Sequence, residues 1–172
     1  MKFEEKLKKK SKKEIWDEYC GFLELSMDEY MEIQQKLLKE QLEIFSNCDL
    51  GQRFLKGKMP KTVEEFRQMI PITTYYDYYD ILLNKQNEKL PSVPEVWLKT
   101  TWESGERTEK WAPYSKKMLD TFRKNIIAAM MLSTSMKKGD FHVKPDFKVL
   151  YALAPLPYIT GLFPDLIDTD IG

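Results

Sequence analysis

The chain has 172 residues, enough for one domain with a substantial core, and its 42% hydrophobic and 31% charged residues are typical of a folded protein. Lysine and arginine (27) balance aspartate and glutamate (27), so the formal net charge is zero and a general nucleic-acid-binding role is disfavoured. Seven lysines gather in residues 1–14. A solvated helix face explains them better than contact with a membrane or RNA.

Two cysteines, Cys20 and Cys48, stand far apart and form no CxxC motif, so neither a disulfide scaffold nor a zinc knuckle is expected. No apolar run approaches the roughly 18 residues that a membrane helix needs. No apolar segment follows the first lysines, as it would in a secretory signal. We therefore expect reduced cysteines and a cytoplasmic protein without a membrane span.

Helices are predicted through most of the N-terminal half. Apolar residues at helical spacing indicate a helix over residues 12–24. Ser26-Met-Asp-Glu29 is a capping box that starts a helix to about Phe45, and Thr62-Val-Glu-Glu65 starts a shorter helix that stops before Pro71. The buried stripe of the longer helix is expected to comprise Met27, Tyr30, Met31, Leu38, Leu42 and Phe45.

Four tyrosines crowd one short helical turn that begins at Thr74, with Asp77 three residues later. Such a cluster could stack on a ligand, but on so short a helix aromatic side chains mostly pack sideways onto the body of the protein. We expect them to wedge this segment onto the core, and residues 84–94, polar and proline-containing, to form a surface connection. The tyrosines are Tyr75, Tyr76, Tyr78 and Tyr79.

Two apolar runs are predicted to be strands, residues 96–101 (VWLKTT) and residues 147–153 (FKVLYAL). Between them Ser115 starts a helix of about 20 residues. Its middle, residues 126–132, is apolar on all sides and so needs partners on both sides. Two strand-then-helix units with continuous apolar strands predict an α/β fold with parallel pairing.

The predicted elements do not add up to a complete domain, because two strands cannot form a whole sheet. We therefore expect residues 1–172 to be a single incomplete domain, the first part of a larger one. Residues 1–95 form its mostly helical region, and residues 96–172 form its αβ region.

The conventional catalytic sets are disfavoured, and no catalytic residue is assigned. His142 is the one histidine of the sequence, and no GxSxG elbow accompanies it. One histidine and scattered carboxylates also make a catalytic metal site unexpected. Asp165, Asp168 and Asp170 lack EF-hand spacing and its closing glutamate, so we interpret them as a solvated acidic segment.

The stretch TTWESGERTEK, residues 100–110, has the residue types of a phosphate-holding loop. Small residues let backbone N–H groups turn inward, hydroxyls add donors, and a lysine neutralises charge. The loop follows a predicted strand and precedes a predicted helix. A charged β-hairpin from residues 96–101 to residues 109–112 would use the same residues, and residue types alone favour neither reading. The candidate phosphate ligands are Thr100, Thr101, Ser104, Gly105, Thr108 and Lys110.

This loop resembles the glycine- and threonine-rich phosphate loop of the adenylate-forming superfamily, which includes the acyl- and aryl-CoA ligases. Within that superfamily the chain resembles the auxin-responsive promoter (acyl-acid amido synthetase) family, which shares the ending Ser104-Gly105-Glu106-Arg107. The segments TVEEFRQMIPITTYYDYYDIL and VLYALAPLPYITGLF are similar to that family too. The resemblance spans about residues 14–163.

The resemblance implies the N-terminal part of the large adenylate-forming domain, a helical start followed by strand–loop–helix–strand units of a mainly parallel sheet. It also implies ATP with Mg²⁺, a carboxylic acid as substrate, and transfer of the activated acyl group to an amine such as an amino acid or to the CoA thiol. Thr100, Thr101 and Ser104 would donate hydroxyl hydrogen bonds to the β- and γ-phosphates. Gly105 would let the backbone approach, and Lys110 would neutralise charge.

The same resemblance implies an acid pocket and leaves an alternative open. Tyr158 stands where many relatives have a histidine, and Gly161 matches their glycine, so both would line that pocket. The family's catalytic lysine lies further along, so this fragment alone is not expected to be active. Trp102 replaces a glycine of the family loop and Glu103 a threonine, which favours a non-catalytic interaction or structural module with a degenerate loop.

Overall fold

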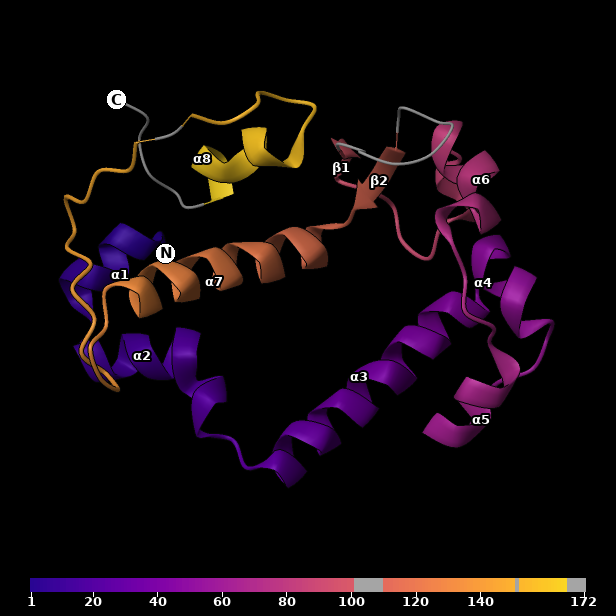
Figure 1. The fold of residues 1–172 in the computed structure, drawn as a ribbon, viewed down its shortest axis with the longest axis horizontal. Helices are drawn as coiled ribbons and strands as arrows, with labels where there is room; N and C mark the ends of the chain where they lie inside the picture. The colour runs from indigo at the N-terminus through magenta and orange to yellow at the C-terminus, as the bar shows by residue number, and fades with distance from the viewer. Residues whose placement is uncertain (101–109, 151, 167–172) are drawn as a thin grey trace. The chain divides into compact units, whose positions relative to one another are not determined.

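The computed structural model describes residues 1–100, 110–150 and 152–166 (Figure 1). The chain divides into two compact units, and each is described by itself. Unit 1 comprises Met1–Leu25 and Lys116–Gly172, and unit 2 comprises Ser26–Ser115. This division differs from the expected one at residue 95, because the first helices join the C-terminal part and the β-hairpin joins the middle helices.

Unit 2 consists of helices and one hairpin. Two of its helices begin where the sequence predicts. The Ser26 hydroxyl accepts from the Glu29 N–H at 3.2 Å while the Glu29 carboxylate accepts from the Ser26 N–H at 2.8 Å. The elements are α3 (Met27–Ser46), α4 (Asp49–Leu55), α5 (Val63–Met69), η2 (Tyr75–Asp77), α6 (Tyr79–Leu83), η3 (Asn87–Lys89), β1 (Val96–Thr100) and β2 (Lys110–Tyr114).

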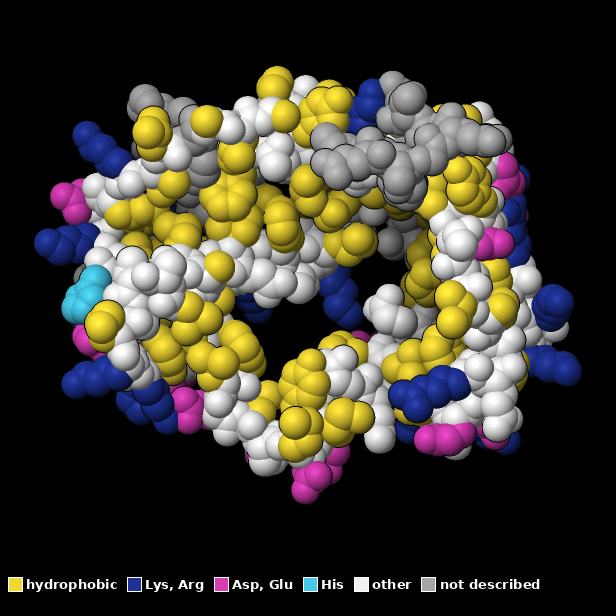
Figure 2. Space-filling view, viewed as in Figure 1, with side chains coloured by type: hydrophobic (Ala, Val, Ile, Leu, Met, Phe, Trp, Pro, Cys, Tyr) yellow, Lys and Arg dark blue, Asp and Glu magenta, His cyan; other side chains and the backbone are white. Residues whose placement is uncertain are grey.

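The buried stripe expected on α3 is wrong for the first half of the helix. Leu42 is buried, but Met27, Tyr30 and Met31 are 74%, 45% and 47% exposed. Figure 2 shows hydrophobic side chains over α3 on the surface. Only the second half is covered, because residues 60–64, at the start of α5, face Leu38 and Leu42 across a cavity of about 280 Å³. Helical periodicity identifies an apolar stripe but does not say which turns of it receive a partner.

The core of unit 2 gathers around α4 and α6, and three of the four tyrosines pack as expected. The Tyr78 ring meets Phe54 edge-on, with ring centroids 5.9 Å apart, and the Tyr79 ring meets Tyr75 edge-on at 5.7 Å. Tyr76 stays 55% exposed. The buried residues of this cluster, called the unit 2 core below, are Cys48, Leu50, Ile81, Leu82 and Leu90.

β1 and β2 pair antiparallel, so the hairpin reading of residues 96–112 is confirmed. The parallel pairing predicted for the strands does not occur among the described strands, which are these two. Residues 110–114, expected to lead straight into a helix, form a second strand that pairs along β1.

Unit 1 is helical in its described residues. The predicted long helix after Ser115 is confirmed as α7, and it has partners on both sides. Ile127 and Met131 join a core with α1 and α2, while Ile126 packs with Leu166 of α8. The elements are α1 (Phe3–Lys9), α2 (Lys12–Cys20), η1 (Gly21–Glu24), α7 (Lys116–Ser133), η4 (Ile159–Leu162) and α8 (Phe163–Leu166).

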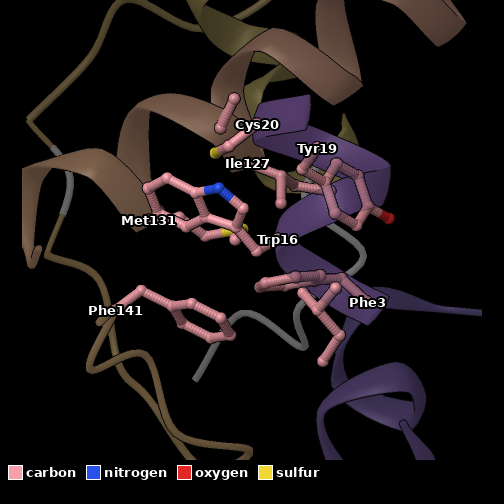
Figure 3. Close-up of a cluster of buried hydrophobic side chains, with 9 residues drawn as sticks. Phe3, Trp16, Tyr19, Cys20, Ile127, Met131 and Phe141 are labelled. Carbon is pink, nitrogen blue, oxygen red and sulfur yellow. The ribbon is translucent and has the colours of Figure 1, made fainter. Parts of the chain in front are cut away.

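The main core of unit 1 lies where α1, α2 and the loop after α7 meet one end of α7 (Figure 3). Trp16, Met131 and Phe141 point toward one another there, and the Phe3 and Tyr19 rings meet edge-on with centroids 5.4 Å apart. Burying such large side chains is the main favourable term for a small unit. The C-terminal half of α7 is therefore held in unit 1 by its packing against α1 and α2.

The strand predicted over residues 147–153 is wrong for the residues described there. Residues 147–150 and 152–153 carry no strand, and Leu150 is 98% exposed. An apolar run becomes a strand only when a neighbouring strand pairs with its backbone, and unit 1 has no strand among its described residues.

Two broader observations bear on function. In the described parts of the chain, no helix is both long and apolar enough to cross a bilayer. No group of three or more histidine, cysteine, aspartate and glutamate side chains gathers there as a metal site would require. Cys20 and Cys48 are buried free thiols, one in each unit.

Candidate functional site

The hairpin brings the two ends of the predicted phosphate loop together. Thr100 ends β1, Lys110 begins β2, and the register places them directly opposite each other. Directly opposed residues of an antiparallel pair project from the same face, with Cβ atoms about 5 Å apart. The side chains of Thr100 and Lys110 therefore leave the same face of the hairpin, where the loop leaves the sheet. We call this pair the hairpin end.

The ammonium of Lys110 lies over an aromatic ring from another element. Its Nζ is 4.7 Å from the centroid of the Tyr75 ring in η2. This distance is within the range in which a cation is attracted to the face of an aromatic ring. Loss of solvent around the ammonium lowers the pKa of Lys110 from its usual value of 10.5.

Tyr75 also holds the backbone of β2. Its hydroxyl accepts a hydrogen bond from the Trp111 N–H at 2.9 Å and donates one to the Trp111 carbonyl at 3.1 Å. The Lys85 ammonium, just after α6, lies 3.4 Å from the centroid of the Trp111 ring. Two elements upstream of the hairpin thus fix the first residues of β2.

The remaining residues predicted for the loop, Thr101, Ser104, Gly105 and Thr108, lie outside the described residues, as do Trp102 and Glu103. Sequence reasoning missed Tyr75 as a neighbour of Lys110 and Lys85 as a neighbour of Trp111. The Thr74–Asp77 capping box predicts the turn that carries Tyr75. The hydrogen bond from Tyr75 to Trp111 joins residues 36 positions apart, so no pattern in the nearby sequence predicts it.

The predicted acid-pocket segment in unit 1 forms a tight turn. The Tyr158 N–H donates to the Pro155 carbonyl at 3.1 Å, and the Gly161 N–H donates to the Tyr158 carbonyl at 2.9 Å. A Cβ on Gly161 would lie 2.3 Å from the Leu156 backbone nitrogen. The turn therefore requires glycine at this position because no side chain fits. Tyr158 itself is half-buried.

A family model described as the GH3 family N-terminal domain matches residues 20–154, well over half of the chain. The chain belongs to the GH3 family. GH3 is the auxin-responsive acyl-acid amido synthetase family, a family of adenylate-forming enzymes, so the resemblance seen in the sequence is confirmed. Neither the curated proteins nor the solved structures gave a match to the chain.

The family match covers one of the two predicted sites of this GH3 domain and not the other. The hairpin end, Tyr75 and Lys85 all lie inside residues 20–154, whereas Tyr158 and Gly161 lie beyond residue 154. The hairpin end also belongs to unit 2 and the turn to unit 1. The family match therefore covers the hairpin end and stops short of the turn.

The described residues of the GH3 hairpin end suit a phosphate group. The Thr100 hydroxyl can donate a hydrogen bond, and the Lys110 ammonium supplies a positive charge. A phosphate beside Lys110 would favour the charged ammonium and so oppose the lowering of its pKa by desolvation. Mg²⁺ in nucleotide sites is held largely by the phosphates and water, so a dedicated carboxylate cluster is not required.

Proposed function

We propose that this GH3 domain is the N-terminal portion of an ATP-dependent ligase that activates a carboxylic acid and passes the acyl group to an amine, with an amino acid as the acceptor. The family match carries this proposal, because acyl-acid amido synthetases use these two substrate classes. Transfer to the CoA thiol is the other acceptor chemistry that the family resemblance implies.

The reaction has two balanced steps. An oxygen of the carboxylate attacks the α-phosphorus of ATP, the bond between the α- and β-phosphates breaks, and pyrophosphate leaves. The amine nitrogen then attacks the acyl carbon of the acyl-adenylate, AMP leaves, and the nitrogen loses a proton. The first step builds negative charge on the leaving pyrophosphate, so a donor group already in place there lowers the barrier.

The hairpin end supplies donors of that type. In our proposal the Thr100 hydroxyl and the Lys110 ammonium bind the β- and γ-phosphates of ATP with Mg²⁺, together with Thr101, Ser104 and Gly105 of the loop. The observation that supports this assignment is the direct opposition of Thr100 and Lys110 across the hairpin. Tyr158 and Gly161 are proposed to line the acid pocket.

We further propose that residues 1–172 form one part of a larger domain whose sheet is mainly parallel. The exposed apolar side chains of Val149, Leu150 and Leu153 support this, because a larger domain would supply an element that covers them. A cytoplasmic location is proposed from the two reduced cysteines.

The test is ATP–pyrophosphate exchange by the full-length protein over a panel of carboxylic acids. The proposal predicts exchange with at least one acid, followed by amide formation when amino acids are added. Exchange followed by transfer to CoA alone would correct the acceptor and keep the first step. No exchange with any acid, and no rise in melting temperature with ATP and Mg²⁺, would support the non-catalytic module that Trp102 and Glu103 favour.

A further inference from the structure

We infer that Tyr75 is a positioning residue for the hairpin end: its hydroxyl fixes the backbone of β2 while its ring holds the ammonium of Lys110. This inference rests on the proposed function of the hairpin end in binding phosphate. Tyr75 belongs to a different element from either strand, and nothing in the loop composition points to it. Three observations support the inference.

The first observation is the pair of hydrogen bonds at Trp111. In an antiparallel hairpin, alternate residues turn their N–H and C=O groups away from the partner strand. Both groups of Trp111 meet the Tyr75 hydroxyl, at 2.9 and 3.1 Å, so they lie on the outer edge of β2. The Tyr75 hydroxyl thus binds the two backbone groups of Trp111 that a third strand would otherwise pair with.

This arrangement needs a neutral phenol, because a phenolate could not donate to the Trp111 carbonyl. Burial raises the pKa of Tyr75 from its usual value of 10, which keeps the hydroxyl protonated at any physiological pH. The outward-facing residues of β2 at this edge also include Pro113, which has no N–H to leave unpaired. Tyr75 therefore makes the hydrogen bonds of Trp111, the outward-facing residue of this edge that lies closest to the loop.

The second observation is the ring of Tyr75 beneath the Lys110 ammonium, 4.7 Å from it. A lysine side chain has four rotatable bonds and loses considerable freedom when it is held in one place. The ring restricts that freedom before a phosphate arrives. Lys110 stands opposite Thr100 in the register, and its ammonium lies over the ring.

The third observation is that Tyr75 is itself firmly held. The Asp77 carboxylate accepts from the Thr74 N–H at 2.6 Å, which closes the turn that carries Tyr75. The Tyr79 ring packs edge-on against the Tyr75 ring, and Tyr75 packs on the unit 2 core. Because Tyr75 is held by its own neighbours, it can fix the position of the β2 backbone.

The experiment compares Tyr75→Phe with Tyr75→Ala in the full-length protein by ATP–pyrophosphate exchange. Tyr75→Phe keeps the ring and removes the hydroxyl, so KM for ATP should rise about fivefold while kcat changes less than about twofold. Tyr75→Ala also removes the support under Lys110, so KM should rise further, by more than about tenfold. In Tyr75→Phe the Trp111 amide hydrogen should exchange with solvent faster than in the wild type.

Tyr78→Phe is the matched control, because it removes a hydroxyl from the same segment, paired with Thr73, without touching β2. It should leave KM for ATP unchanged. An unchanged KM in Tyr75→Phe, or an equal rise in Tyr78→Phe, would overturn the inference and leave the proposed function standing. Absence of exchange by the wild-type protein would instead overturn the proposed function, and this inference with it.

Discussion

The hairpin end and the turn of residues 154–162 are held in opposite ways. Every hydrogen bond described above for the turn joins residues close in sequence, and Thr160 adds one more by donating to the Ala154 carbonyl at 3.0 Å. The hairpin end depends on Tyr75 and Lys85, which come from elements far upstream. Short-range hydrogen bonds therefore close the turn, whereas the hairpin end depends on the packing of unit 2.

Substitutions in the two regions should therefore have different consequences. A substitution in the unit 2 core should disturb the hairpin end without touching it, because Tyr75 packs on that core. A substitution in the turn should act only where the turn itself is crowded. The following predictions test this contrast, beginning with the largest effect.

Ile81→Ala should have the largest effect on stability. Ile81 is completely buried in the unit 2 core, so its truncation leaves a cavity and should cost about 3 kcal/mol of unfolding free energy. Urea denaturation measures the loss, and faster exchange of the Trp111 amide hydrogen would show that the damage reaches β2. Ile44→Ala is the control, since Ile44 is 37% exposed on α3 and should lose less than about 1 kcal/mol.

Gly161→Ala should destabilise the turn by about 2 kcal/mol, because the new methyl would overlap backbone atoms that must then move. Gly21→Ala is its control: Gly21 has helical backbone angles and no atom within 4 Å of the added Cβ. Thermal unfolding of both variants checks the pair. Equal behaviour of the two would show that the turn adapts easily and that its glycine is not required.

The sequence predicts local structure well where the cause is local. The N-cap residues Ser26 and Thr62 give helix starts within one residue, since the side chain that accepts from the first free N–H groups stands at the start itself. The apolar middle of α7 likewise predicts partners on two sides, and the structure has them.

The failures share one physical reason, which is that pairing and covering depend on distant parts of the chain. Residues 110–114 become a strand because β1 is there to pair with, whereas the described residues of unit 1 offer residues 147–150 no strand as a partner. Met27 and Tyr30 have the same helical spacing as Leu42 but no covering element. At the candidate site, Thr100 and Lys110 could be predicted from residue types, whereas Tyr75 required the tertiary fold.

Asp80→Asn should produce the smallest effect, visible only in acid. Arg53 in α4 makes two hydrogen bonds to the Asp80 carboxylate in α6, at 2.8 and 2.6 Å, and lowers the pKa of Asp80 from 3.8 to about 2. A lowered pKa in the folded state stabilises the protein above the unfolded pKa, and this contribution is lost as the pH falls from about 4 to about 2.

Urea denaturation across that pH range measures the contribution. The variant should lose less stability than the wild type between pH 4 and pH 2. Ile44→Ala, which removes no titratable group, should keep the wild-type slope. Identical slopes for Asp80→Asn and the wild type would mean that the pair does not join α4 to α6 in solution.

The most direct test of the central claim is the affinity of the full-length protein for ATP with Mg²⁺, measured by calorimetry for Lys110→Ala and Lys58→Ala. Both variants remove one positive charge from unit 2, but only Lys110 stands opposite Thr100. We expect Lys110→Ala to weaken ATP binding about tenfold and Lys58→Ala to leave it within about twofold. Equal affinities for the two variants would contradict the assignment of the hairpin end to the phosphates.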